Sequence, residues 1–127
     1  MVESGEVCRI ADSPRIAIMV KYMLCKINPH KRNVWLDWCN VLMTVSRDEA
    51  METLVEEDLL REMCLIYGQG EDSYVLYRHE SLPGKEKKPA NMGRALNRKH
   101  FEVFRECLTP IDPQTVGYDI VVTPRSE

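Results

Sequence analysis

The stretch from Trp35 to Arg78 constrains the fold of this chain more than any other part of it. Two runs of apolar residues spaced three and four apart predict two consecutive helices. Ser46 followed by Glu49 is a capping-box pattern and predicts where the second helix begins. Two β-prone segments, 64–67 and 73–78, then flank five residues that include two glycines, which predicts a β-hairpin. The order is therefore helix, short turn, helix and hairpin.

Further elements are predicted on either side of this stretch. A helix over 13–28 would begin at Ser13-Pro14 and end where Pro29 disfavours the α conformation of the residue before it. Its apolar side would consist of Ile16, Val20, Met23, Leu24 and Ile27. A fourth helix is predicted from Asn91, and a short strand over 116–122.

Together these elements predict an α+β winged-helix domain, with a three-helix core, a two-stranded wing and an extra C-terminal helix and short strand. We expect residues 1–12 to be a flexible arm and residues 13–80 to form the winged-helix domain. Residues 81–127 would then supply a linker, and a helix and strand that pack on the same domain.

Three motifs in the central stretch resemble DEP domains, a family of winged-helix modules. Leu36-Asp37-Trp38-Cys39 stands where the family's second helix carries Asp-Trp-Leu, and Ser46-Arg47-Asp48-Glu49-Ala50 matches the start of its third helix. Tyr77-Arg78-His79 resembles the end of its closing strand, whereas the Phe-x-Gly motif before the second helix is absent. The resemblance implies a module that docks onto proteins in signalling and associates with membranes through basic surfaces.

Bulk composition limits the classes of protein that the chain can belong to. It is 127 residues long, 44% hydrophobic and has a net charge of −3, which suits a folded domain without a global attraction to nucleic acid. Its five cysteines are widely spaced and form no CxxC pair, so we expect free thiols in a reducing compartment and no metal site. No apolar run approaches the length of a membrane span, and we expect a cytoplasmic or nuclear location.

The predicted third helix is acidic. Residues 46–62 hold seven acidic residues against two arginines, which argues against duplex DNA as a partner of this helix. Either the acidic side is simply solvated, or it docks a basic protein. The candidate partner-binding residues here are Asp48, Glu49, Glu52 and Glu56. Tyr74 and Tyr77 join them as candidates, because they face opposite sides of a strand and one must point outward.

The segment after the hairpin is basic. Its candidate anion-binding or lipid-binding residues are Lys85, Lys87, Lys88, Arg94, Arg98 and Lys99. Three interpretations are open: an anion-binding patch for phospholipid head groups, RNA or an acidic protein; a solvated surface; or an arm that folds onto the acidic helix of its own or a neighbouring subunit.

Catalysis has little support in the sequence. The closest cysteine–histidine pairs are Cys25 with His30 and His100 with Cys107, and both pairs fit a structural role; no catalytic residue and no cofactor is predicted. We therefore expect a non-enzymatic protein–protein interaction module in signalling or regulatory assembly, with protein partners, a second copy of the chain among them, and anionic lipid. The alternative is a nucleic-acid-binding regulator that uses the basic segment 85–105.

Overall fold

Four strands and three helices follow one another in the computed structural model, which describes residues 17–124. In chain order they are β1 (Met19–Ile27), α2 (Arg32–Met43), α3 (Arg47–Glu56), β2 (Arg61–Gln69), β3 (Asp72–Ser81), α4 (Ala95–Cys107) and β4 (Leu108–Pro110). The strands form one antiparallel sheet in the order β2-β3-β1-β4.

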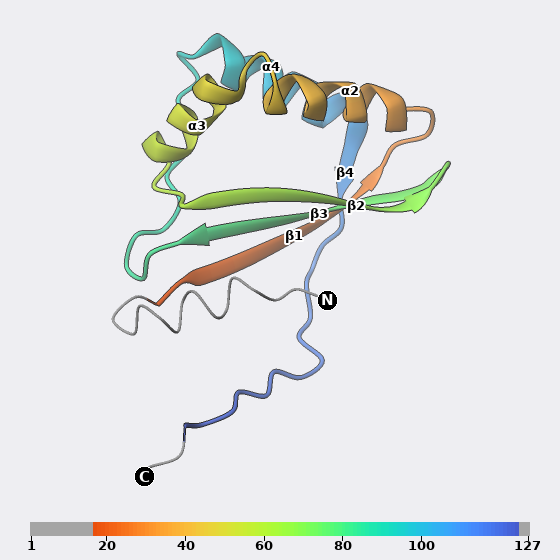
Figure 1. Cartoon of the computed structure of the whole chain (residues 1–127). Helices are drawn as coiled ribbons and strands as arrows, with labels where there is room; N and C mark the ends of the chain where they lie inside the picture. The colour runs from red at the N-terminus through yellow and green to blue at the C-terminus, as the bar shows by residue number, and fades with distance from the viewer. Residues whose placement is uncertain (1–16, 125–127) are drawn as a thin grey trace.

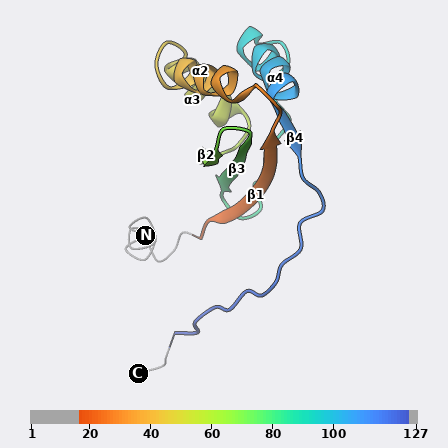
Figure 2. The same ribbon diagram turned by 90° about the vertical axis from the view of Figure 1, so that its right-hand side faces the viewer.

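The helices α2, α3 and α4 lie on the same side of this sheet, and within residues 17–124 no helix lies on the other side (Figure 1). This connectivity, strand–helix–strand–strand–helix–strand with the first strand in the middle of the sheet, is the ferredoxin-like arrangement. Here two short helices, α2 and α3, stand where that arrangement has its first helix. Figure 2 shows the same two layers from the side, with residues 111–124 running away from the helices.

The core lies between the helix layer and the sheet. Alternate residues of the central strands, Cys25 on β1 and Val75 and Tyr77 on β3, point toward the helices and are buried. Trp35 of α2 is 1% exposed and meets the ring of Tyr77 edge-on, with centroids 6.4 Å apart. On α4, Val103 packs into the same cluster. Burial of these apolar side chains fixes which face of each strand turns inward.

The winged-helix prediction is wrong. A winged helix needs three helices ahead of its hairpin, but the segment predicted as the first helix forms β1 and lies at the centre of the sheet. β1 pairs with β3 over eight residues, from Met19 opposite Ser81 to Lys26 opposite Tyr74. Its outward-facing residues are also apolar, so the sequence matched a helical period by coincidence. Residues 13–16 of the predicted helix, and the predicted arm 1–12, lie outside the described residues.

The hairpin and the other predicted helices are present, although their ends differ from the prediction. The hairpin is confirmed, and its strands extend to Arg61–Gln69 and Asp72–Ser81. The predicted third helix is α3, but it ends at Glu56, and Ser46 makes no side-chain hydrogen bond at its N-cap, so the capping box does not form. The fourth helix is present as α4. The strand predicted over 116–122 is not formed, because these residues have no strand partner within the described chain.

Candidate interaction surfaces

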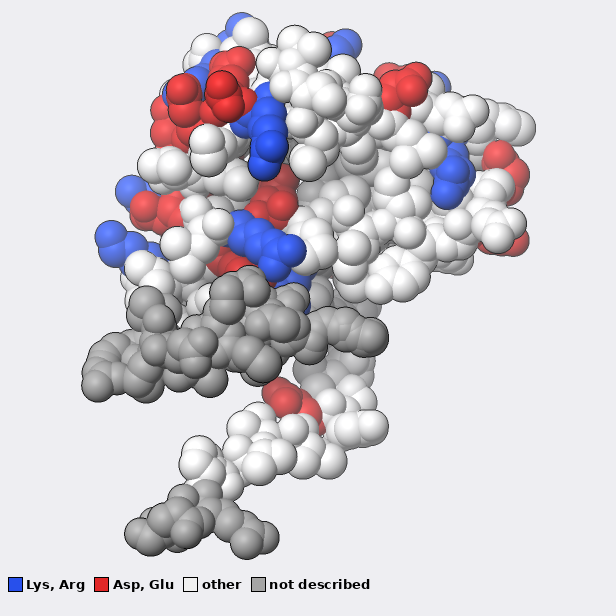
Figure 3. Space-filling model, viewed as in Figure 1, with Lys and Arg blue, Asp and Glu red and all other residues white. Residues whose placement is uncertain are grey.

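The three glutamates of α3 share an ion pair within the chain with Arg94, which precedes α4. Its guanidinium Nε and Nη2 donate to Glu56 at 3.0 and 2.9 Å, and its Nη groups reach Glu49 and Glu52 at 3.3 Å each. The hydrogen bond from Arg94 lowers the pKa of Glu56 below its ordinary value. Red and blue side chains accordingly lie together over α3 in Figure 3. Of the candidate acids, Asp48 makes no ion pair among the described residues.

The lysines after the hairpin also return to α3. Lys87 Nζ lies 3.0 Å from a carboxylate oxygen of the buried Glu57, and Lys88 Nζ lies 3.1 Å from Asp58. The backbone N–H of Lys88 donates to the Glu57 carbonyl at 2.9 Å, which ties the linker to the end of the helix. The acidic and basic segments that the sequence set apart therefore contact each other within one molecule, which was one of the three interpretations of the basic segment.

The remaining basic candidates make local contacts. Arg98 Nη1 donates to the carbonyl oxygens of Met92 and Gly93 at 2.8 and 3.0 Å, and Lys99 pairs with Glu102 at 3.0 Å. Lys85 makes no ion pair within the described residues, although its backbone N–H donates to Leu82.

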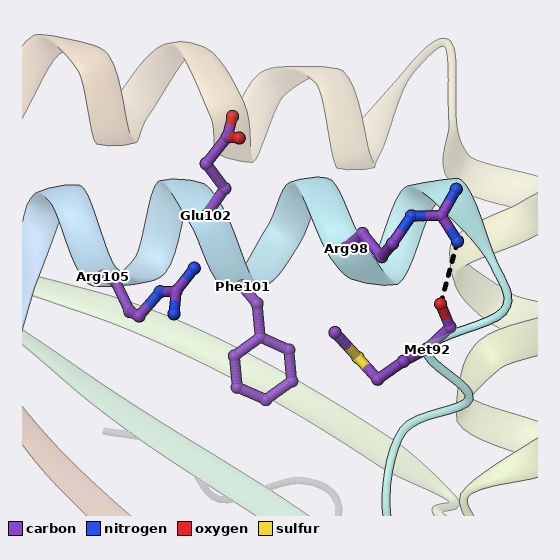
Figure 4. Close-up of a pocket in the computed structure, with 5 residues that line it drawn as sticks. All are labelled: Met92, Arg98, Phe101, Glu102 and Arg105. Carbon is purple, nitrogen blue, oxygen red and sulfur yellow. Dashed lines mark hydrogen bonds between the residues drawn. The ribbon is translucent and has the colours of Figure 1, made fainter.

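A shallow pocket lies on the outer side of α4. It is lined by Met92, Arg98, Phe101, Glu102 and Arg105. In Figure 4 the Phe101 ring and the Arg105 side chain project to one side of α4, and the Glu102 side chain projects to the other. The Arg98 side chain bends back, and its guanidinium donates to the Met92 carbonyl. Arg98 is therefore already hydrogen-bonded to the backbone, and the lining includes the carboxylate of Glu102. The pocket does not concentrate positive charge as an anion site would.

The two candidate tyrosines of β3 lie on opposite faces of the sheet, as predicted. Tyr77 is 3% exposed in the core, and burial raises the pKa of its phenol, so it cannot contact a partner as the folded chain stands. Tyr74 points away from the helices, with Lys26 Nζ 4.6 Å from the centre of its ring.

The four thiols within the described residues are buried or partly buried, and so is His100. Burial raises the pKa of Cys25 to about 11. Cys39 and Cys64 lie side by side, and the hydrogen bond between their thiols lowers the pKa of Cys64. Trp38 Nε1 donates to Nδ1 of His100 at 2.9 Å, and burial lowers the pKa of that imidazole. No group of three or more potential metal ligands occurs among residues 17–124. His30, which the sequence places near Cys25, lies with its Nδ1 3.6 Å from a carboxylate oxygen of Glu71.

The sheet face that carries no helix within the described residues is here called the open face, and of its residues the sequence had pointed only to Tyr74. Strand register aligns its side chains in four rows across β2, β3 and β1: Tyr67–Tyr74–Lys26, Leu65–Leu76–Leu24, Met63–Arg78–Tyr22 and Arg61–Glu80–Val20. The second row consists entirely of leucines, and in the fourth the Glu80 carboxylate pairs with Arg61 and Arg78. Tyr67 is 55% exposed and Tyr22 46% exposed, although both are large side chains on a regular sheet. An antiparallel sheet with one solvated face normally places polar residues there, so this face is unusually apolar.

Comparison of the chain with protein-family models, with curated proteins and with solved structures finds no match. These comparisons leave the resemblance to DEP domains untested. Within the described residues, every helix is too short or too polar to cross a lipid bilayer.

Proposed function

We propose that this protein is a non-enzymatic protein–protein interaction module and that its contact surface is the open face of the sheet. The leucine row Leu65–Leu76–Leu24, flanked by exposed tyrosines, is the observation that carries the proposal. Contiguous exposed apolar surface is characteristic of protein interaction sites, and each Å² of it buried against a partner contributes roughly 25 cal/mol. A cytoplasmic or nuclear location, which the free thiols favour, belongs to the same proposal.

The acidic and basic segments are less suited to this role than the sequence led us to expect. Arg94 already occupies the glutamates of α3, so a basic partner would have to displace an ion-pair network within the chain. Charges paired in this way gain little from exchanging one partner for another. Asp48, Lys85 and the other charged candidates would instead contribute to specificity at the rim of a contact.

Single-stranded nucleic acid is less well suited to the open face than protein. Bases stack on the flat faces of aromatic rings, but Lys26 lies over the ring of Tyr74, and the Arg78 guanidinium lies 6.0 Å from the ring centre of Tyr22. The leucine row also separates these two tyrosines on the sheet. An apolar protein surface would cover leucines and tyrosines together.

A face variant that combines Leu24→Lys with Leu65→Lys tests the proposal, with Val45→Lys as a matched control at an exposed position between α2 and α3. Each purified protein is analysed by light scattering and then used as bait in an extract of its native cell. We expect the wild type and the control to form the same assembly, with themselves or with another protein, and the face variant to lose it. An assembly that survives in the face variant, or salt-sensitive binding of single-stranded oligonucleotides in place of protein, would overturn the proposal.

A further inference from the structure

The C-terminal segment, residues 111–124, leaves the sheet without covering its own apolar side chains. Val116, Tyr118, Ile120 and Val122 alternate with Gly117, Asp119 and Val121, the period expected of a strand that is apolar on one side. Tyr118 is nevertheless 84% exposed and Val122 87% exposed. Both views show the segment running away from the helices and off the sheet (Figures 1 and 2).

The segment starts beside the open face. The backbone N–H of Ile111 donates to the Leu24 carbonyl at 2.9 Å, which places Ile111 next to the end of the leucine row. The next residue in line to donate along the same edge is Pro113, opposite Tyr22. Because proline has no N–H, the ladder cannot continue in the same chain.

The outer edge of β1 is consequently free over residues 19–23 within the described part of the chain. β4 pairs only with Cys25, Lys26 and Ile27, so the outward backbone groups of Val20 and Tyr22 have no partner strand there. An unpaired edge of this kind binds an added strand readily.

We propose that the C-terminal segment of a second copy of this chain pairs as an added strand with the free edge of β1, so that its apolar side chains extend the open face. The inference rests on the proposed function, because it names the partner that binds at the border of the same surface. Residues 116–122 contain no proline and are rich in β-branched residues, and they would span about 23 Å, against about 17 Å for the five edge residues.

Side-chain alternation and charge agree with this placement. When the even-numbered residues of the segment extend the open face, Asp119 turns to the opposite side of the sheet. Lys21 is exposed on that side of β1, between Met19 and Met23, so an opposite charge is available there. The segment itself carries only Asp112 and Asp119 as charged residues. The open face carries Lys26, Arg61 and Arg78 against Glu80, which pairs with both arginines, so the face is positive on balance.

Each chain offers one segment and one edge, so a reciprocal exchange between two copies satisfies both and closes with twofold symmetry. The continuity of the segment with Ile111 places its starting point at the border of the surface that it would extend in the partner. A dimer is therefore the expected assembly.

Complementation between two variants tests the exchange. One chain ends at Gln114 and lacks the strand-forming residues; the other carries Leu24→Lys and Leu65→Lys and lacks the apolar surface. By light scattering we expect the wild type to be a dimer and each variant alone to be a monomer, whereas an equimolar mixture should contain a one-to-one heterodimer. Ile120→Asp in the wild type should raise the dimer Kd by about 30-fold or more, as loss of a central apolar contact does. Circular dichroism confirms that each variant is folded.

The outcomes separate this inference from the proposed function. A wild-type monomer, or a dimer unchanged by truncation after Gln114, would overturn the exchange. If the face variant alone then lost binding to another protein, the proposed function would still stand. If neither variant changed any assembly, both would fail.

Discussion

Trp35 offers the sharpest test of how the fold is held together. Its side chain is 1% exposed and packs edge-on against Tyr77 and Phe104, with ring centroids 6.4 and 6.3 Å away. The indole Nε1 is buried without a partner that meets hydrogen-bond geometry; the Cys64 thiol, whose pKa it helps to lower, is at most a weak acceptor. The ring therefore stabilises the fold, while its N–H group opposes that stabilisation.

These two contributions predict different results for two substitutions. Trp35→Ala removes the whole ring and should lower the free energy of unfolding by about 3–5 kcal/mol. Trp35→Phe removes roughly 50 Å² of buried apolar surface, a loss of about 1.3 kcal/mol at 25 cal/mol per Å². It also removes the unsatisfied donor, which restores about 1–3 kcal/mol. The net effect of Trp35→Phe should lie within about 1 kcal/mol of zero.

Urea denaturation followed by far-ultraviolet circular dichroism measures both values, and equal m-values would confirm that the unfolded states are comparable. Val45→Ala, at a residue that is 90% exposed, serves as the control and should change stability by less than about 0.5 kcal/mol. The reasoning fails if Trp35→Phe destabilises as much as Trp35→Ala, since the indole N–H would then have a partner in solution. It also fails if Trp35→Ala costs less than about 1 kcal/mol, well below the usual cost of a large core truncation.

Four further predictions test individual groups. Burial lowers the pKa of His100 in the folded chain, so the unfolded chain binds a proton more readily than the folded one. The free energy of unfolding should therefore fall as the pH drops below 6.5, the ordinary pKa of histidine. Urea midpoints measured from pH 8 to pH 5 should show this decline, and His100→Gln should reduce it. With its pKa near 11, Cys25 should react with a thiol reagent at pH 8 only when urea unfolds the chain, and equal rates with and without urea would contradict its burial. Gly68→Ala should destabilise the hairpin more than Gly70→Ala, because both have positive φ but only a side chain at 68 would collide with the Asp72 carbonyl; equal urea midpoints would refute this. Arg94→Gln should lower the urea midpoint in low salt, and should lower it by a smaller amount in 1 M NaCl, because salt screens the ion pairs. Arg98→Gln, at an arginine that binds backbone carbonyls, should change the midpoint little. An Arg94→Gln effect independent of salt would argue against the ion-pair network.

The elements that could be predicted are those whose sequence has a single period. α2 and α4 bury one side each, and the hairpin has its glycines at positive φ between two β-prone segments, with Gly68 at 86°. β1 could not be predicted, because Tyr22 and Leu24 on one face and Met23 and Cys25 on the other make the run apolar throughout. A sequence of this kind fits a helix and a strand equally well, and only the pairing with β3 decides between them.

The charged candidate residues could be identified from the sequence, but the ion pairs that they form within the chain could not. Clusters of one sign stand out in a sequence, yet the distance between Arg94 and Glu56 is fixed only by how α4 packs beside α3. Packing brings the two clusters together, and each then screens the other from outside partners.

Of the apolar residues on the open face, only Tyr74 was predicted to contact a partner. Leu24 was placed on the apolar side of a helix and Leu65 in a strand of the wing, and neither was named as a candidate. Among the residues that the structure describes, the helices cover one face of the sheet, so alternate positions on β1, β2 and β3 turn away from them. Exposed leucines aligned across three strands weaken the solubility of a lone chain unless something covers them. The apolar C-terminal segment and the free edge of β1 lie beside that surface. We therefore expect the partner of this protein to bind at the open face and its edge, and not at the paired charges of α3.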